Sequence, residues 1–273
     1  MKQVVERRRP RPTAEVMSTV CFRVTRACNL GCSYCQAPPN QRQLPYSQLV
    51  ESLAFLAKRG AQRIKFTGGE PFVHHQLLPL IFECRKKGME PTIVTNGTLL
   101  TEAHLEALRA AIARVKISLH GPRERHDSLQ GRPVYDTILA NARKLISAGI
   151  ETSVHTLLHR EYELDLRKWI EFLASEEVHK VSFMTFVPRG RGRELEERWA
   201  FNDEELEELS QHIAELTEFY REQITVRFLD FARQPYLVFE TDGRFVWEVG
   251  PETLDAQLQD SDQLYPLNKI RGL

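Results

Sequence analysis

Short β-rich runs alternate with amphipathic helical runs six times between about residues 19 and 187. The β-rich runs are short and bounded by turn residues, which predicts strands. They span residues 20–25, 63–67, 92–95, 115–120, 152–157 and 181–187. Between them, apolar residues recur at three- and four-residue spacing, as at Leu105, Leu108 and Ile112. This spacing is typical of helices that bury one face.

The ends of these helices carry recognisable caps. Gly60, Gly88 and Gly149 fall just past three of them, where a left-handed residue is needed. Thr101 and Asn202 stand where N-cap residues belong. Strict βα alternation with short links implies parallel strands joined by right-handed crossovers. The pattern therefore favours an α/β fold, as a barrel, a partial barrel or an open doubly wound sheet, with its active site at the carboxyl ends of the strands.

The pattern changes after residue 222. Residues 236–241 and 244–249 flank Asp242-Gly243, which predicts a hairpin with a two-residue turn. We expect three regions: a basic, disordered N-terminal arm over residues 1–17, a core over 18–200, and a C-terminal part over 201–273. In that last part, a helix, the hairpin and an irregular tail pack on the core.

The charges exclude some partners. Lys plus Arg equals Asp plus Glu at 37 each, so the chain has no net field that favours nucleic acid or membrane. No stretch approaches the ~20 apolar residues of a membrane span, and no apolar signal segment begins the chain. We therefore expect a cytoplasmic protein.

Three of the five cysteines stand in the loop after the first strand, at positions 28, 32 and 35. Three close thiolates can bind three irons of a [4Fe-4S] cubane and leave the fourth iron open. The alternative is a zinc site, but structural zinc takes four ligands and no fourth Cys or His lies nearby in sequence. His74 or His120 would have to fold back to complete it.

Three further motifs follow the cysteines in order: Gly68-Gly69-Glu70-Pro71 after the second strand, Thr95-Asn96-Gly97 after the third and Ser118-Leu119-His120-Gly121 after the fourth. Together with CxxxCxxC they resemble the radical S-adenosylmethionine superfamily, over about residues 18–190. The resemblance implies a partial (β/α)6 TIM-like barrel with a short C-terminal α/β-hairpin extension. It also implies an enzyme with a [4Fe-4S] cluster on Cys28, Cys32 and Cys35.

In such enzymes the open iron binds S-adenosylmethionine, which one electron from a reduced flavodoxin or ferredoxin-type donor cleaves to a 5′-deoxyadenosyl radical. The cofactor contacts that the resemblance assigns are Tyr34, Gly68, Gly69, Glu70, Thr95, Asn96, Ser118, His120 and Arg132. Tyr34 is also explained by packing, Asn96 by a turn, and Arg132 by an ordinary surface position.

Three residues are candidates for substrate binding. Arg189 and Arg191 belong to an arginine- and glycine-rich loop after the sixth strand, whose guanidinium groups suit a phosphate or carboxylate. His155, in the fifth strand, faces the cavity or is a satisfied core residue. A solvated flexible loop is the other reading of the arginines. We expect a small, anionic substrate.

The sequences of the GGEP, TNG and SLHG motifs resemble those of the superfamily branch that contains molybdenum-cofactor, peptide-modifying and heme-pathway maturases. The chain departs from many of these in having no cysteine after Cys84, so a second cubane is not expected. A peptide maturase is one alternative, although about 17 residues before the first strand are few for a leader-binding module. A non-catalytic iron-sulfur or nucleotide-binding module is the other.

Overall fold

The computed structural model describes residues 18–40, 43–231, 233–250 and 256–258. Within these ranges the strands form one ten-stranded sheet in the order β10-β9-β8-β1-β2-β3-β4-β5-β6-β7. The strands that follow one another from β1 to β7 pair in parallel. Their bounds are β1 Thr19–Thr25, β2 Arg63–Gly68, β3 Glu90–Thr95, β4 Arg114–Ser118, β5 Thr152–Leu158, β6 Lys180–Thr185 and β7 Thr225–Leu229.

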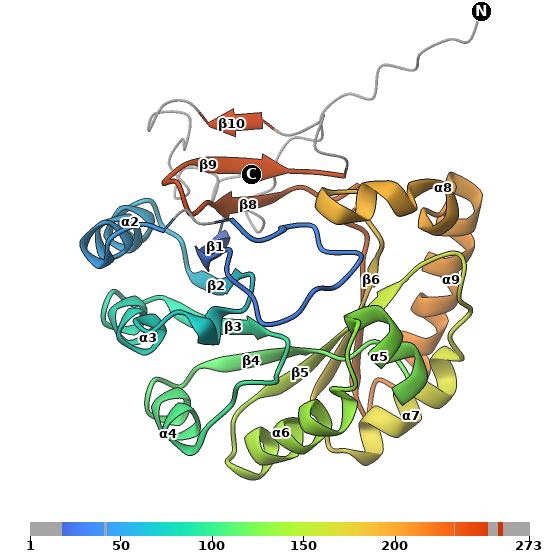
Figure 1. Cartoon of the computed structure of the whole chain (residues 1–273). Coiled ribbons are helices and arrows are strands. Elements are labelled where there is room, and N and C mark those ends of the chain that lie inside the picture. Colours follow the sequence, from blue (N-terminus) through green and yellow to red (C-terminus); the bar gives the residue numbers. More distant parts are fainter. Residues whose placement is uncertain (1–17, 41–42, 232, 251–255, 259–273) are drawn as a thin grey trace, which may run out of the picture.

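Helices join these strands and cover the outer face of the curved sheet (Figure 1). The α-helices are α2 Tyr46–Lys58, α3 Leu77–Lys86, α4 Glu102–Ala110, α5 Arg123–Gln130, α6 Tyr135–Ser147, α7 Leu166–Ser175, α8 Glu196–Trp199 and α9 Asp203–Phe219, and the 3-10 helices are η1 Pro71–Val73 and η2 Gly190–Leu195. Thr101 and Asn202 cap α4 and α9 through reciprocal side-chain bonds, as predicted. Gly60, Gly88 and Gly149 have positive φ, also as predicted.

The core lies between the sheet and these helices. Alternate strand residues such as Ile64 and Phe66 of β2, and Val115 and Ile117 of β4, are fully buried there. Because side chains alternate along a strand, their neighbours face the concave inner side. The inner face therefore carries the residues that can reach a bound ligand.

The predicted α/β partial barrel is confirmed, and a seventh parallel strand extends it. β7 lies at the edge of the sheet beside β6. β7 was not predicted from the sequence because Thr225 and Arg227 are exposed, so its five residues lack the apolar run of a central strand.

The predicted hairpin is also confirmed. β8 (Tyr236–Phe239) and β9 (Phe245–Glu248) are antiparallel, and Gly243 has φ +85° in the turn between them. β10 (Ala256–Leu258) pairs with β9. β8 adds in parallel to the free edge of β1, so the C-terminal hairpin lies beside the first strand of the described chain (Figure 1).

The expected basic arm over residues 1–17 and most of the irregular tail lie outside the described residues. Among the residues that are described, no helix combines the length and the apolar character needed to cross a membrane.

Candidate functional site

The three clustered cysteines lie on the loop between β1 and α2, at the carboxyl edge of the sheet. All three are partly exposed thiols. The backbone N–H of Leu30 points at Sγ of Cys28, 3.4 Å away, and the N–H of Cys35 donates to the carbonyl of Cys32. Burial raises the pKa of Cys32 to about 11, and the charges of Cys35 and Cys28 add to that rise. The three thiols therefore lie on one loop, close enough for the charges of two of them to act on the third.

Two glycines hold the β2 loop against this loop. The N–H of Gly69 donates to the carbonyl of Thr25, and that of Glu70 donates to the carbonyl of Ala27. A Cβ on Gly68 would stand 1.9 Å from the Thr25 oxygen, and one on Gly69 would stand 2.1 Å from the Ala27 oxygen. The close approach of two backbones thus requires glycine at both positions, because only glycine lacks a Cβ.

Glu70 is completely buried and bonds to the loop after β3. One carboxylate oxygen accepts from Oγ1 of Thr95 at 2.7 Å and from the N–H of Phe72, and the other accepts from the N–H of Asn96 at 2.7 Å. Burial raises the pKa of Glu70 to about 7, against the opposing effect of these donors. An ionised carboxylate can accept about four hydrogen bonds, so Glu70 has one acceptor position left after these three donors. An ammonium group could bind at that position.

Asn96 connects the β3 loop to the cysteines. Its Nδ2 donates to Oδ1 of Asn29 at 2.9 Å and lies 4.0 Å from Sγ of Cys28. Thr98 completes this group, because its hydroxyl bonds to both asparagines. Asn29 and Thr98 were not among the predicted site residues, although Asn29 lies within the cysteine motif and Thr98 directly follows Thr95-Asn96-Gly97.

Tyr34 bonds through its side chain rather than lying free. Nδ1 of His120 accepts a hydrogen bond from the N–H of Leu157. The ring proton of the neutral imidazole is therefore on Nε2, and Nε2 donates to the Tyr34 oxygen at 2.6 Å. Gln130 bonds to both Tyr34 and the Cys32 thiol, at 3.2 and 2.7 Å. Burial, followed by the charge of His126, holds the pKa of His120 well below its usual value. The loops after β1 and β4 are therefore tied together at Cys32.

Ser118 and His155 stand side by side on β4 and β5, in register at the carboxyl side of the sheet. His155 is 8% exposed, and its Nε2 has no hydrogen-bond partner among the described residues. It is thus not the satisfied core histidine that was the alternative reading.

Arg132 lies exposed on the surface just after α5, and no contact of its side chain with the other candidate residues is seen in the described part of the chain. Its assignment to the cofactor stays a prediction. A different arginine, Arg125 of α5, is 5% exposed and donates to the carbonyl of Leu157. Nε and Nη1 of Arg125 have no partner within the described ranges. Sequence patterns missed Arg125 because they do not distinguish a buried arginine from a surface one on a charged helix.

The arginine- and glycine-rich loop packs onto the cysteine loop. The N–H of Arg191 donates to the carbonyl of Cys35 at 3.0 Å, and a Cβ on Gly190 would clash with that same oxygen. The side chain of Arg191 is exposed. Arg191 thus lies beside the cysteines, where its role toward substrate stays a prediction.

Arg189, by contrast, is 4% exposed. Its guanidinium pairs with Glu248 and donates to the carbonyl of Gly250. The ordinary reading of this arginine as a solvated loop residue is therefore wrong, and its guanidinium is held by the C-terminal hairpin.

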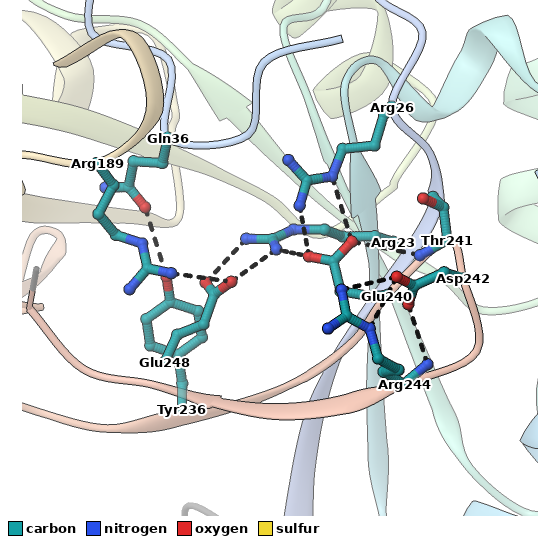
Figure 2. A network of polar contacts seen from close by, with 10 residues as sticks. All are labelled: Arg23, Arg26, Gln36, Arg189, Tyr236, Glu240, Thr241, Asp242, Arg244 and Glu248. Carbon is teal, nitrogen blue, oxygen red and sulfur yellow. Dashed lines mark hydrogen bonds and ion pairs between the residues drawn. The ribbon is translucent and has the colours of Figure 1, made fainter. Parts of the chain in front are cut away.

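Arg189 belongs to a buried polar network beneath the cysteine loop (Figure 2). Arg23 of β1 lies between Glu240 and Glu248. It forms an ion pair with Glu240, and it donates to both carboxylate oxygens of Glu248 at 2.7 and 2.8 Å. Arg26 pairs with Glu240 from the other side. Burial lowers the pKa of Arg23, but the two carboxylates hold it well above its usual value. The hairpin is thus fixed to β1 by charge as well as by strand pairing.

The cysteines fit a cubane better than a single metal ion. Among the described residues, no three His, Cys, Asp or Glu side chains form a group that would hold one ion. In a cubane each thiolate binds a different iron, so the sulfurs need not converge on one point. His120 faces Tyr34, and His74 is buried with Nδ1 accepting from the N–H of Gln76. Neither supplies the fourth ligand that structural zinc takes.

The fold is a parallel partial barrel, and its carboxyl edge carries a three-cysteine loop, a glycine pair and a buried glutamate. These features together define a class of protein with a cofactor site at the barrel mouth. Residues 22–173 match the model of the radical SAM superfamily. The chain belongs to the radical SAM superfamily. That superfamily uses a [4Fe-4S] cluster and S-adenosylmethionine.

Two relatives and one solved structure illustrate the similarity. Fe-coproporphyrin III synthase of Methanosarcina barkeri is 29% identical over 64% of this chain and 46% of its own length. GTP 3',8-cyclase of Chlorobaculum tepidum is 31% identical over 60% of this chain and 52% of its own length. The chain thus spans about half the length of these curated relatives. Both are named as enzymes.

The fold is shared with SuiB of Streptococcus suis, whose structures include complexes with S-adenosylmethionine and with the precursor peptide SuiA. The peptide complex has a TM-score of 0.72 at 14% identity, covering 93% of this chain and 66% of that one.

Replacing Glu70 with glutamine is expected to lower stability by about 1–3 kcal/mol, because the new amide nitrogen faces N–H and O–H donors in a buried place. Thermal unfolding should show a lower Tm, and S-adenosylmethionine affinity should fall with it. Glu83→Gln, at a surface glutamate paired with Lys87, is the matched control. Equal Tm values for the two variants would contradict the role assigned to Glu70.

Proposed function

We propose that this chain is a radical SAM enzyme acting on a small anionic molecule. The observation that carries the proposal is the three-cysteine loop held at the carboxyl edge by Glu70, Asn96 and Tyr34. When bound, the cluster and S-adenosylmethionine supply one-electron cleavage to methionine and a 5′-deoxyadenosyl radical, which takes a hydrogen atom from the substrate.

The chain's own residues would hold and orient these groups. Cys28, Cys32 and Cys35 would each bind one iron. The free position on the Glu70 carboxylate suits the methionyl ammonium group, which would lie over the glycine pair. Ser118 and Asn96 stand at neighbouring strand ends and suit the remaining polar groups of the cofactor.

Arg125 is a further candidate for a cofactor contact. Its Nε and Nη1 groups are buried without a hydrogen-bond partner among the described residues, which is unfavourable even though the guanidinium stacks on the Tyr162 ring. Desolvation lowers its pKa to about 10, so it remains charged at neutral pH. A carboxylate, such as that of the methionyl group, would satisfy both free N–H groups.

The electron would come from a reduced flavodoxin or ferredoxin-type protein, and the reducing cytoplasm would protect the thiolates. An anionic small molecule is favoured as substrate because Arg191 stands exposed beside the cysteine loop. One relative's name specifies GTP, which is a polyanion. We keep the division into an arm at 1–17, a core at 18–200 and a C-terminal part at 201–273 as a proposal.

The test is anaerobic reconstitution with iron and sulfide, followed by incubation with S-adenosylmethionine and dithionite. We expect 5′-deoxyadenosine and methionine in equal amounts, with at least a 10-fold drop when the reductant is left out. Chromatography with mass detection measures both. A protein that holds a full cluster yet forms no 5′-deoxyadenosine would instead be a non-catalytic iron-sulfur module.

A further inference from the structure

The inner face of the barrel carries a set of basic side chains that the cofactor site does not use. On β2, Lys65 alternates with the buried Ile64 and Phe66, and therefore faces the concave side. The same alternation places basic residues on the inner face of β4, β6 and β7. Two basic residues on that face of β2 and β4 already have polar partners, because Arg63 bonds to Thr19 and Arg114 pairs with Glu90 and Glu151. The other four, which we call the cationic layer, are Lys65, Lys116, Lys180 and Arg227.

Strand register places two members of the cationic layer on one row and the other two on the adjacent inward-facing rows. Lys116 of β4 is in register with Ser153, which is in register with Lys180 of β6. Neighbouring strands are ~4.8 Å apart, so Lys116 and Lys180 stand about two strand spacings apart on one row. Burial lowers the pKa of Lys116 to about 7, and the charges of Lys65, Lys180 and Arg227 lower it further. The four side chains thus act on one another.

No carboxylate of the described residues is bonded to the cationic layer. Within the ranges that the structure describes, none of its four side chains makes an ion pair or a side-chain hydrogen bond. Glu151 attracts Lys180 but is bonded to Arg114 at 2.8 Å. Gathering like charges around the partly desolvated Lys116 opposes folding unless an anion enters. The arrangement therefore indicates a ligand of negative charge.

His155 supplies an independent sign of that ligand. It is in register with Ser118 on one side and with Ser182 on the other, and Ser182 is in register with Arg227. Its buried Nε2 has no partner among the described residues. Burial, followed by the charges of the cationic layer, keeps the pKa of His155 well below its usual value, so the ring is neutral. A neutral imidazole can donate its single N–H to an anionic oxygen.

The cationic layer lies below the carboxyl edge of the sheet, at a depth that one substrate molecule could span. Lys65 precedes Gly68 by three residues, and Lys116 precedes Ser118 by two. At ~3.3 Å per residue, these two lysines stand roughly 7–10 Å below the carboxyl edge where the cysteine loop lies, and Lys180, at the start of β6, stands deeper. A molecule anchored there by one end would extend toward the cofactor.

We propose that Lys65, Lys116, Lys180, Arg227 and His155 bind the multiply charged anionic group of the substrate, a phosphate chain or a set of carboxylates, inside the barrel. This inference rests on the proposed function, because the bound anion is part of the molecule that would lose hydrogen. It goes further in naming the substrate class and the residues that select it.

Two probes test the site and separate its possible ligands: inorganic tripolyphosphate and citrate. Calorimetric titration of the reconstituted protein at 0.15 M salt should detect one-to-one binding of at least one of them. Tripolyphosphate binding alone would indicate a phosphorylated substrate, and citrate binding alone would indicate a polycarboxylate. Lys116→Met should weaken binding at least 10-fold. Lys168→Met, at an exposed lysine of α7, should not change it.

A second measurement guards against a folding artefact. Without anion, Lys116→Met should have a Tm at least as high as the wild type, because it removes a buried, repelled charge. With anion, only the wild type and Lys168→Met should gain stability, as expected for a ligand that binds the folded state. Failure of both probes to bind the wild type, or equal loss in both lysine variants, would overturn the inference.

Failure of the inference is distinguishable from failure of the proposed function. The 5′-deoxyadenosine assay on wild-type protein needs no anion. Formation of 5′-deoxyadenosine without binding of either probe would reject the cationic layer alone. Binding of a probe by a protein that never cleaves S-adenosylmethionine would reject the radical reaction, and with it the claim that the bound anion is its substrate.

Discussion

Cys32→Ala is expected to lose nearly all of its iron and sulfide after anaerobic reconstitution, along with the brown absorbance of the cluster. The thiolate is the ligand, and the other two cysteines of the chain are poorly placed to replace it. Cys84 is fully buried in α3, and Cys21 lies within β1. Iron and sulfide assays, together with the visible spectrum, measure the loss.

Cys21→Ala is the matched control for that experiment. It removes a partly exposed thiol seven residues from Cys28 without touching the loop. It should keep its iron content within about the error of the assay. If Cys32→Ala kept a full complement of iron, the cluster ligands would have to be reassigned. If zinc rather than iron were recovered from the wild type, the cubane itself would be excluded.

Arg23→Met is expected to destabilise the protein by about 3–5 kcal/mol, because it leaves Glu240 and Glu248 buried with too little positive charge. For a chain of this size that corresponds to a fall in Tm on the order of 10 °C. Thermal unfolding followed by circular dichroism measures it. The loss should also loosen the hairpin, since Arg23 joins β1 to both of its strands (Figure 2).

Arg114→Met provides the comparison, because Arg114 also pairs with two carboxylates, those of Glu90 and Glu151, but is half-exposed. Exposed pairs are worth about 0–1 kcal/mol, so its Tm should change by no more than a few degrees. Similar losses in the two variants would show that burial does not decide the strength of the Arg23 network.

Local patterns were sufficient for most of the fold. The six expected strands and the hairpin were found because each carries its own signal, in alternation, caps or turn residues. β7 was missed because its exposed residues weaken that signal. The pairing of β8 with β1 was also beyond local patterns, since it joins residues more than 200 positions apart. Only the folded chain brings them together.

The residues of the candidate site also fall into two groups: those that the sequence motifs predicted and those that only the folded structure identifies. Motif residues such as Glu70 and Asn96 were singled out by their place after strand ends, and the structure brings them to one edge. Arg125 and Gln130 were missed, because their importance comes from burial beside the cysteine loop. The cationic layer was missed as a set for a related reason: a basic residue within a strand is unremarkable until the pairing of strands places it near others on the same face.

The attachment of β8 to β1 has a consequence for how the protein is made. A nascent chain leaves the ribosome with β1 first, yet the edge of β1 stays unpaired and Arg23 stays without its carboxylates until residues 236–248 have been synthesised. The cysteine loop follows directly after that strand. We therefore expect iron and sulfide delivery to succeed only after nearly the whole chain has emerged, so that a truncated translation product ending before residue 236 would not retain metal.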